Sequence, residues 1–198
     1  MESQVRRRTH TARILTMKMT ASTRSAMAVF RGWDGYQKSL VHAIAPLSRE
    51  LLAWRGEAHL RSVGEIASHI SQGRIWWFHR VLGQGSPDFA GQVAALRPDE
   101  FNAIVENAAE LVRWLEATWR VIEEALEAWT VDDLDKTLVQ PYGGKTYAIP
   151  RQWIVWRIMA HDMHHGGELA FALGMQGVRI PELGDMGGHI TEPPLAQL

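Results

Sequence analysis

The sequence predicts an all-α protein, a four-helix bundle with a short β-hairpin insert before its last helix. Four long segments place their apolar residues three or four positions apart, which is the period of a helix with one buried face. Between the third and fourth segments, residues 138–149 form two short β-like runs around Gly143-Gly144. The chain has 198 residues, of which 46% are hydrophobic and 22% charged, so it is large enough for one domain with a full core.

The first helix is expected over residues 26–45, and Pro46 ends it. Its apolar residues share one helical face: Val29, Trp33, Tyr36, Leu40 and Ile44. A connector follows over residues 46–61 and contains a short helical turn at 47–54. The segment before the helix, residues 1–25, is rich in arginine and is predicted to be a disordered basic tail, either native or the product of a start codon assigned too far upstream.

The second helix begins at Ser62, because Ser62 and Glu65 have the spacing of a capping box. Its apolar face is expected to hold Val63, Ile66, Ile70, Gly73, Trp77 and Val81. Gly83 and Gly85 end it, and residues 83–97 are predicted to be a loop. Trp76 and Trp77 point about 100° apart on a helix, so only one of them can face the core and the other is expected to line a cavity or an interface.

The third helix is predicted over residues 99–129, where the apolar period is longest. After the hairpin, the fourth helix is expected to have Pro150 at its first position, to run to about Leu173 and to have Gly174 as its C-cap. The bundle therefore spans residues 26–180, and residues 181–198 are predicted to be a C-terminal loop tail.

Composition disfavours several classes of function. Lysine and arginine total 21 against 22 acidic residues, a net charge of −1, which does not favour nucleic-acid binding. The absence of cysteine excludes a disulfide framework, a zinc ribbon, an iron–sulfur cluster and a cysteine nucleophile. No apolar run is long enough for a membrane span, or for an export signal after the N-terminal arginines. We therefore expect a cytoplasmic protein with no nucleic-acid and no membrane partner.

The candidate metal ligands are histidines. His161 and His165 lie four residues apart, so they share one face of the fourth helix and can hold one ion. From the spacing alone, the alternative is a hydrogen-bonded polar layer in the core. A third ligand is expected from another helix, and His69 lies at the edge of the apolar face of the second helix. Three neutral imidazoles would leave one position open, as catalytic metal sites do.

Two charged residues lie on the same line of the fourth helix as this pair. Glu168 could be a fourth ligand, a general base or an acceptor for an imidazole N–H, or it could be a solvent-exposed residue at the helix end. Arg157, one turn before His161, could hold a substrate carboxylate or pair with an acid of the bundle. Trp76 is the residue expected to contact a bound cofactor.

Three motifs together resemble the DinB/YfiT-like metal-binding family: Ala67-Ser68-His69-Ile70, Trp76-Trp77, and the run from His161 to Leu169. The resemblance covers about residues 26–180 and implies an up-up-down-down bundle, often dimeric, with a divalent metal such as zinc, nickel or iron on His69, His161 and His165. The sequence departs from the family at Glu168, where glutamine is more common, and in the two residues before it, where Arg-Gly is more common.

The resemblance also implies a function, because characterised relatives use bacterial low-molecular-weight thiols such as bacillithiol or mycothiol. We therefore expect a metal-dependent, thiol-using transferase or isomerase that acts on a small electrophile, and a homodimer. One alternative is a non-catalytic metal-binding protein of a stress response. Another is a metallohydrolase, since His161-Asp162-Met163-His164-His165 has the form H-D-x-x-H. An open pocket at the metal would favour the transferase, and a closed site would favour the binding protein.

Overall fold

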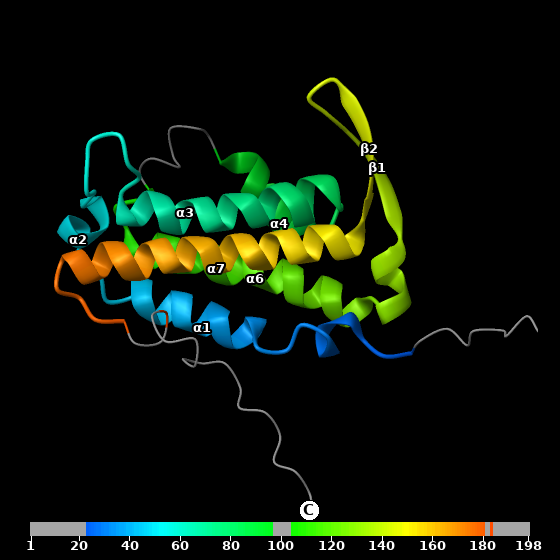
Figure 1. Cartoon of the computed structure of the whole chain (residues 1–198), viewed down its shortest axis with the longest axis horizontal. Helices are drawn as coiled ribbons and strands as arrows, with labels where there is room; N and C mark the ends of the chain where they lie inside the picture. The colour runs from blue at the N-terminus through cyan, green and yellow to red at the C-terminus, as the bar shows by residue number, and fades with distance from the viewer. Residues whose placement is uncertain (1–22, 97–103, 181–182, 184–198) are drawn as a thin grey trace, which may run out of the picture.

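Four helices form the body of the protein, as predicted: α1 (Trp33–Ile44), α3 (Val63–Arg74), α6 (Ala108–Ala128) and α7 (Arg151–Met175) (Figure 1). The computed structural model describes residues 23–96, 104–180 and 183. The predicted tails lie almost wholly outside the described residues. None of the helices in the described part of the chain is both long enough and apolar enough to cross a membrane.

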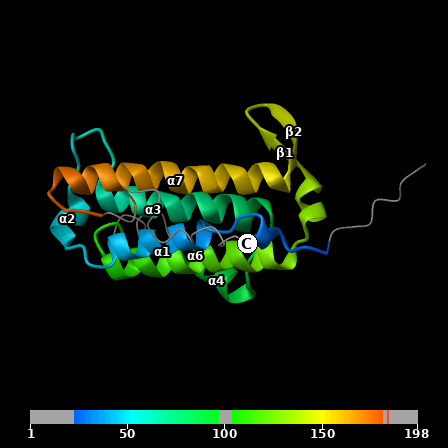
Figure 2. The same ribbon diagram turned by 60° about the horizontal axis from the view of Figure 1, so that its bottom comes forward.

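The order of helix directions differs from the order that the resemblance implied. Trp33 and Tyr36 of α1 contact Asp162 and Met163 of α7, so these two helices advance together. Helices α3 and α6 run in the opposite direction (Figures 1 and 2). The bundle is therefore up-down-down-up rather than up-up-down-down. The chain reverses between α1 and α3, whereas α6 begins at the same end of the bundle as α3 and so runs parallel to it (Figure 1).

The first predicted helix is interrupted. Residues Ala26–Ala28 form a 3-10 turn, and α1 begins only at Trp33, after Gly32 with a φ of 98°. Val29, expected on the buried face, is 49% exposed, whereas Trp33, Tyr36, Leu40 and Ile44 are buried. The short turn expected in the connector is α2 (Arg49–Ala53), which Ser48 caps.

The capping box of the second helix is confirmed: Ser62 accepts from the Glu65 amide, and the Glu65 carboxylate accepts from the Ser62 amide. Beyond α3 the chain continues as a π-helix, η2 (Ile75–Val81). A hydrogen bond from the Leu82 amide to the Trp77 carbonyl spans five residues, as π-geometry requires. This wider turn rotates the buried face onto Ile75 and Phe78 and leaves Trp77 only half-buried.

The loop predicted over residues 83–97 contains a helix, α4 (Pro87–Ala95), so that prediction was wrong. Ser86 caps it by accepting from the Phe89 amide, Pro87 takes a first-turn position, and Phe89 and Val93 are buried.

The third helix was predicted to start too early. Asn107, whose side chain accepts from the Glu110 amide, is the N-cap of α6, and the part of the prediction that covers residues 99–103 lies outside the described residues.

The hairpin is confirmed as β1 (Thr137–Tyr142) paired antiparallel with β2 (Lys145–Pro150). A short 3-10 helix, η3 (Val131–Asp135), links α6 to it.

Pro150 directly precedes α7 rather than opening it, and the C-cap prediction at Gly174 was wrong. Helix α7 continues to Met175 and has Gln176 as its C-cap. Gly177 follows with a φ of 76°, and the Val178 amide donates to the Leu173 carbonyl.

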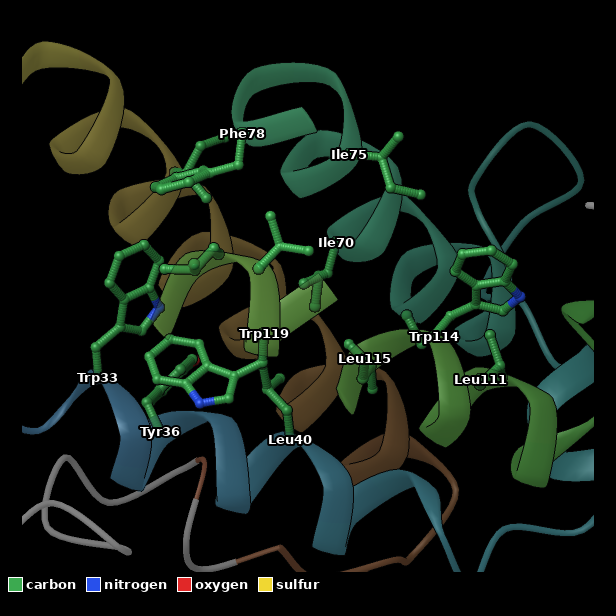
Figure 3. Close-up of a cluster of buried hydrophobic side chains, with 14 of the residues drawn as sticks. Trp33, Tyr36, Leu40, Ile70, Ile75, Phe78, Leu111, Trp114, Leu115 and Trp119 are labelled. Atoms are coloured by element: carbon green, nitrogen blue, oxygen red, sulfur yellow. The ribbon is translucent and has the colours of Figure 1, made fainter. Parts of the chain in front are cut away.

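The core lies between the four helices (Figure 3). Large fully buried side chains come from every helix: Trp33 and Leu40 from α1, Ile70 from α3, Leu111, Leu115 and Ile122 from α6, and Ile154 from α7. Trp33 packs edge-on against Trp119, with ring centroids 5.4 Å apart. Burial of this apolar surface is the main driving force for packing α3 against α7, the two helices that carry the candidate ligands.

Candidate metal centre

The structure brings His69 of α3 together with His161 and His165 of α7. The ring centroids of His69 lie 4.9 Å from His161 and 4.7 Å from His165, and the last two are 4.4 Å apart. One ring nitrogen of each residue lies within 4.8 Å of the others. His165 is 5% exposed, and His69 and His161 are half-buried. The geometry thus groups the three residues that the sequence selected.

Gly73 makes room for this cluster. A Cβ atom at Gly73 would lie 2.6 Å from Cε1 of His161, which is closer than such atoms approach. Only glycine therefore allows the His161 ring to lie against α3. The sequence analysis placed Gly73 on the apolar face of the second helix but did not detect this role, because the contact joins residues of two different helices.

Glu168 orients His165. The His165 Nδ1 and the Glu168 Oε2 are 2.7 Å apart, so an N–H at Nδ1 donates to the carboxylate and leaves Nε2 free to bind a cation. His164, which is exposed, contacts the other carboxylate oxygen of Glu168 at 3.2 Å. Among the roles that the sequence left open for Glu168, this geometry corresponds to the acceptor for an imidazole N–H.

His161 has a different environment. Its Nδ1 is buried without a hydrogen-bond partner in the described structure, and so is Oδ1 of the neighbouring Asp162, 3.9 Å away. A buried polar atom without a partner costs free energy, and a cation bound by the imidazole would let Nδ1–H turn to this carboxylate oxygen. Three converging imidazoles, two of them beside a carboxylate, therefore fit a divalent metal ion.

Burial favours the neutral form of two of the three histidines, His69 and His165. Burial lowers the pKa of His69 to about 4, and the positive charges of Arg61 and the other two histidines act in the same direction. Burial also lowers the pKa of His165, against the opposing effect of its hydrogen bond to Glu168. For Glu168, burial raises the pKa, but the His165 bond and nearby positive charge outweigh burial and lower it. Imidazole lone pairs and a carboxylate are thus available together.

A buried ion pair lies directly behind the cluster, and the sequence analysis missed it. The Nη2 and Nε of Arg74 donate to Oδ2 of Asp162 at 2.8 and 3.0 Å, and the Trp33 indole donates to the same oxygen at 2.9 Å. Arg74 also donates to Gln37 Oε1 and to the Leu115 carbonyl, so one guanidinium connects all four helices. The sequence did carry a signal for the burial of each charge. Arg74 lies four residues after Ile70 and Asp162 four residues after Ile158, so each charged residue shares a helical face with an apolar one.

The cluster opens onto a cleft of about 430 Å³, lined by His69, His161, Trp76, Trp77 and Arg157 among others. Trp76 is 47% exposed at this cleft. The Arg157 guanidinium lies over the rings of Trp77 and Trp153, 5.7 and 5.4 Å from their centroids. Within the described part of the chain, no acid pairs with Arg157. The ion pair between Arg157 and an acid of the bundle is thus not observed among the described residues, and the Arg157 charge faces the cleft.

His69 also borders a second cleft, of about 370 Å³, on the side of Arg55, Arg61 and Glu65. The cluster is therefore accessible from two directions. His59 is exposed and lines this second cleft together with His69. His42 is exposed and lines neither cleft, and His79 contacts the Gln84 carbonyl at 2.8 Å.

Fold and site together define a class: a four-helix bundle with a three-imidazole candidate metal centre formed by α3 and α7. The chain belongs to the DinB superfamily, whose family model matches residues 33–169. Among solved structures it is similar to a DinB-like protein from Bacillus cereus ATCC 10987, with a TM-score of 0.61 and 17% identity over 80% of this chain and 97% of that one.

A DinB-like protein from Bacillus subtilis, YjoA, also matches, with a TM-score of 0.47 and 17% identity over 79% of this chain and 94% of that one. No curated protein matches the sequence. At 17% identity the structure from Bacillus cereus supports the fold alone, and the chemistry must be argued from the residues of this chain.

Proposed function

We propose that the protein is a divalent-metal-dependent enzyme that joins an external low-molecular-weight thiol to a small electrophile, as a transferase or an isomerase. The observation that carries the proposal is the convergence of three imidazoles at the wall of an open cleft. A closed site would suit a metal-storage or structural role, whereas an open one admits a substrate.

His69, His161 and His165 would hold the ion, and a set of three nitrogens suits zinc, nickel, cobalt or iron(II). When bound, such an ion supplies a positive charge that keeps a coordinated thiol deprotonated at neutral pH. Glu168 fixes the ring of His165 through the 2.7 Å hydrogen bond and so acts as a positioning residue. Neutral imidazoles leave the positive charge uncompensated, which favours an incoming anion.

The chain contains no cysteine, so the nucleophilic sulfur must come from a cosubstrate such as bacillithiol or mycothiol. In a transfer, a carbon–sulfur bond forms, the leaving group departs with its electron pair and the thiol proton passes to solvent. In an isomerisation, the carbon–sulfur bond forms and later breaks, and the thiol is regenerated. Arg157 would bind a carboxylate of the thiol or of the electrophile, and the exposed ring of Trp76 would pack against the thiol cofactor.

The metallohydrolase alternative finds less support. Its H-D-x-x-H interpretation needs Asp162 to activate a water molecule, yet Asp162 is fully buried and its Oδ2 is held by Arg74 and Trp33. The non-catalytic stress-response protein is the outcome that remains if the enzymatic test fails.

We also propose a cytoplasmic location, since low-molecular-weight thiols such as bacillithiol and mycothiol are cytoplasmic reductants.

We further propose that the protein is a homodimer. Helix α7 has an outer face with large exposed apolar side chains that no described residue covers: Trp156, Met163, Phe171 and Met175. An apolar face of this kind is typical of an interface. A light-scattering mass of twice the 22.3 kDa chain at micromolar concentration is expected, and Phe171→Glu should reduce it. A mass of one chain for the unmodified protein would contradict the dimer.

The experiment that tests the enzymatic proposal follows the loss of free thiol. Metal-loaded protein is incubated with bacillithiol or mycothiol and a panel of small electrophiles. We expect thiol consumption that a chelator and His165→Ala abolish to the same extent, whereas His42→Ala, which changes an exposed histidine of α1 that lines neither cleft at the cluster, leaves it unchanged. Thiol loss that is insensitive to the chelator, or no thiol loss with any electrophile, would favour the non-catalytic metal-binding protein.

A further inference from the structure

A third and larger cleft lies beside the candidate metal centre, between the hairpin, the start of α7 and the π-helix η2. Its volume is about 990 Å³, and its lining includes Trp76, Trp77, Tyr147, Trp153 and Arg157. This volume is at the upper end of the range for small-molecule sites. In Figure 1 the hairpin projects beyond the helices at the end of the bundle where α7 begins.

The walls of this cleft are aromatic and only partly covered. Trp76 is 47% exposed, Tyr147 43% and Trp153 40%. Trp77 and Trp153 meet edge to face, with ring centroids 5.5 Å apart and planes at 67°. Large rings left accessible in one concave site are unusual unless they bind something, and flat rings favour a flat apolar partner.

The charge in the cleft is positive. Arg157 lies against Trp77 and Trp153, as described above. No acidic residue is among the described residues that line this cleft or the 430 Å³ cleft at the imidazole cluster. The Arg80 guanidinium, 5.9 Å from the centroid of the Trp76 ring, adds a second cation to the 430 Å³ cleft. An arginine positioned on aromatic rings keeps its N–H donors available, and these donors match a carboxylate in geometry.

This cleft and the 430 Å³ cleft at the imidazole cluster are continuous, because Trp76, Trp77 and Arg157 line both of them. Arg157 precedes His161 by four residues, which is about 6 Å along the axis of α7. A ligand whose ring lies under the hairpin and whose carboxylate binds Arg157 would therefore extend toward the imidazole cluster.

We propose that this cleft binds a small planar aromatic carboxylate. Its ring would pack between Trp153, Trp76 and Tyr147, and its carboxylate would pair with Arg157. The further assignment of this ligand as the electrophile of the thiol reaction rests on the proposed function, whereas its binding does not.

The test measures binding alone, by calorimetric titration of chelator-treated protein with 2-naphthoate and with its uncharged counterpart 2-naphthamide. We expect saturable binding of one naphthoate per chain, about tenfold tighter than naphthamide. Arg157→Gln should remove the difference between the two ligands. The matched control is Arg113→Gln, since Arg113 also lies over an indole, that of Trp114, but outside the cleft.

A second pair of variants tests the aromatic wall. Trp153→Ala should weaken naphthoate binding by about tenfold or more, whereas Trp156→Ala, three residues further along α7 and not among the residues lining the cleft, should leave it unchanged. The proposal is overturned if naphthoate does not saturate at millimolar concentration, if naphthamide binds equally well, or if the two tryptophan variants behave alike. Neither metal nor thiol is present, so this result is independent of the thiol-consumption test.

Discussion

At the scale of single residues, Gly73 is a constrained position in direct contact with the cluster. We predict that Gly73→Ala lowers metal affinity by about tenfold or more, because the new methyl group would displace the His161 ring from its place against α3. The measurement is a competition titration against a chromophoric chelator. The control is Gly91→Ala, since no atom lies within 4 Å of a Cβ built at that position. Equal affinities for the two variants would show that the close approach of His161 to α3 is not needed for binding.

Arg74 has a structural role that can be separated from the chemistry. Replacement by Met would leave Asp162 charged, fully buried and bonded only to the Trp33 indole. Loss of one partner of a buried pair costs about 3–5 kcal/mol. We therefore predict that Arg74→Met lowers the free energy of unfolding in urea by that amount.

The matched control for Arg74→Met is Arg113→Met. Arg113 also lies over a tryptophan ring and also pairs with an acid, Glu110, but both of these side chains are exposed. An exposed pair contributes about 0–1 kcal/mol, so the control should lose little stability. Similar losses in the two variants would mean that the burial of the Arg74–Asp162 pair has no energetic consequence.

At the scale of helices and strands, what could be predicted from the sequence depended on how local the signal is. The capping box at Ser62 and the Gly143-Gly144 turn involve residues only a few positions apart, and both are present. Ser86-Pro87 before Phe89 was a local signal of the same kind for α4, but the glycines around it favoured a loop interpretation. The sequence carried no comparable signal for the π-helix, in which Ile75 and Phe78 are the buried residues.

The same distinction holds for the candidate site. The i, i+4 spacing of His161 and His165 is local and could be read from the sequence, and His69 was selected by its position at the edge of an apolar helix face and by the resemblance. The contact of Gly73 with His161 and the pair formed by Arg74 and Asp162 join residues 88 positions apart, so no spacing rule reveals them. Only the packing of α3 against α7 brings these groups together.

The end of α7 allows a prediction at this scale. Gly174 lies within the helix and a Cβ there would meet nothing within 4 Å, whereas Gly177 has a φ of 76°. Gly174→Ala should therefore raise the free energy of unfolding by about 0.5–1 kcal/mol through helix propensity. Gly177→Ala should lower it by about 1 kcal/mol, because an L-residue is strained in that conformation. Urea unfolding of both variants checks the two signs, and the reverse signs would place the helix end at Gly174 after all.

At the scale of the whole molecule, the lowered pKa values of His69 and His165 link stability to pH. Each pKa lies below its ordinary value in the folded chain, so the unfolded chain binds more protons as the pH falls below about 6.5. The free energy of unfolding of chelator-treated protein should therefore fall between pH 6.5 and pH 4. The fall should be smaller in His69→Gln, which lacks the histidine whose pKa is about 4. Urea titrations at several pH values measure this, and identical profiles for the two proteins would contradict the assignment to His69.

Metal binding should stabilise the fold, because the three imidazoles converge only when α3 and α7 are packed together. An ion that binds the folded chain alone adds about 2.7 kcal/mol at a free concentration one hundred times its Kd. For a chain of this length that corresponds to a rise in Tm of about 5–10 °C. We predict this rise for chelator-treated protein on addition of zinc, measured by circular dichroism.

Two variants determine whether this stabilisation comes from the cluster. His161→Ala should abolish the rise in Tm while leaving the helical spectrum intact, because two imidazoles cannot replace the three-nitrogen set that grips the ion between two helices. His42→Ala should keep the full rise, since His42 is exposed and lines neither cleft at the cluster. If zinc stabilised His161→Ala as strongly as the unmodified chain, the ion would be bound elsewhere, and the convergence of His69, His161 and His165 would be a polar layer in the core rather than a metal centre.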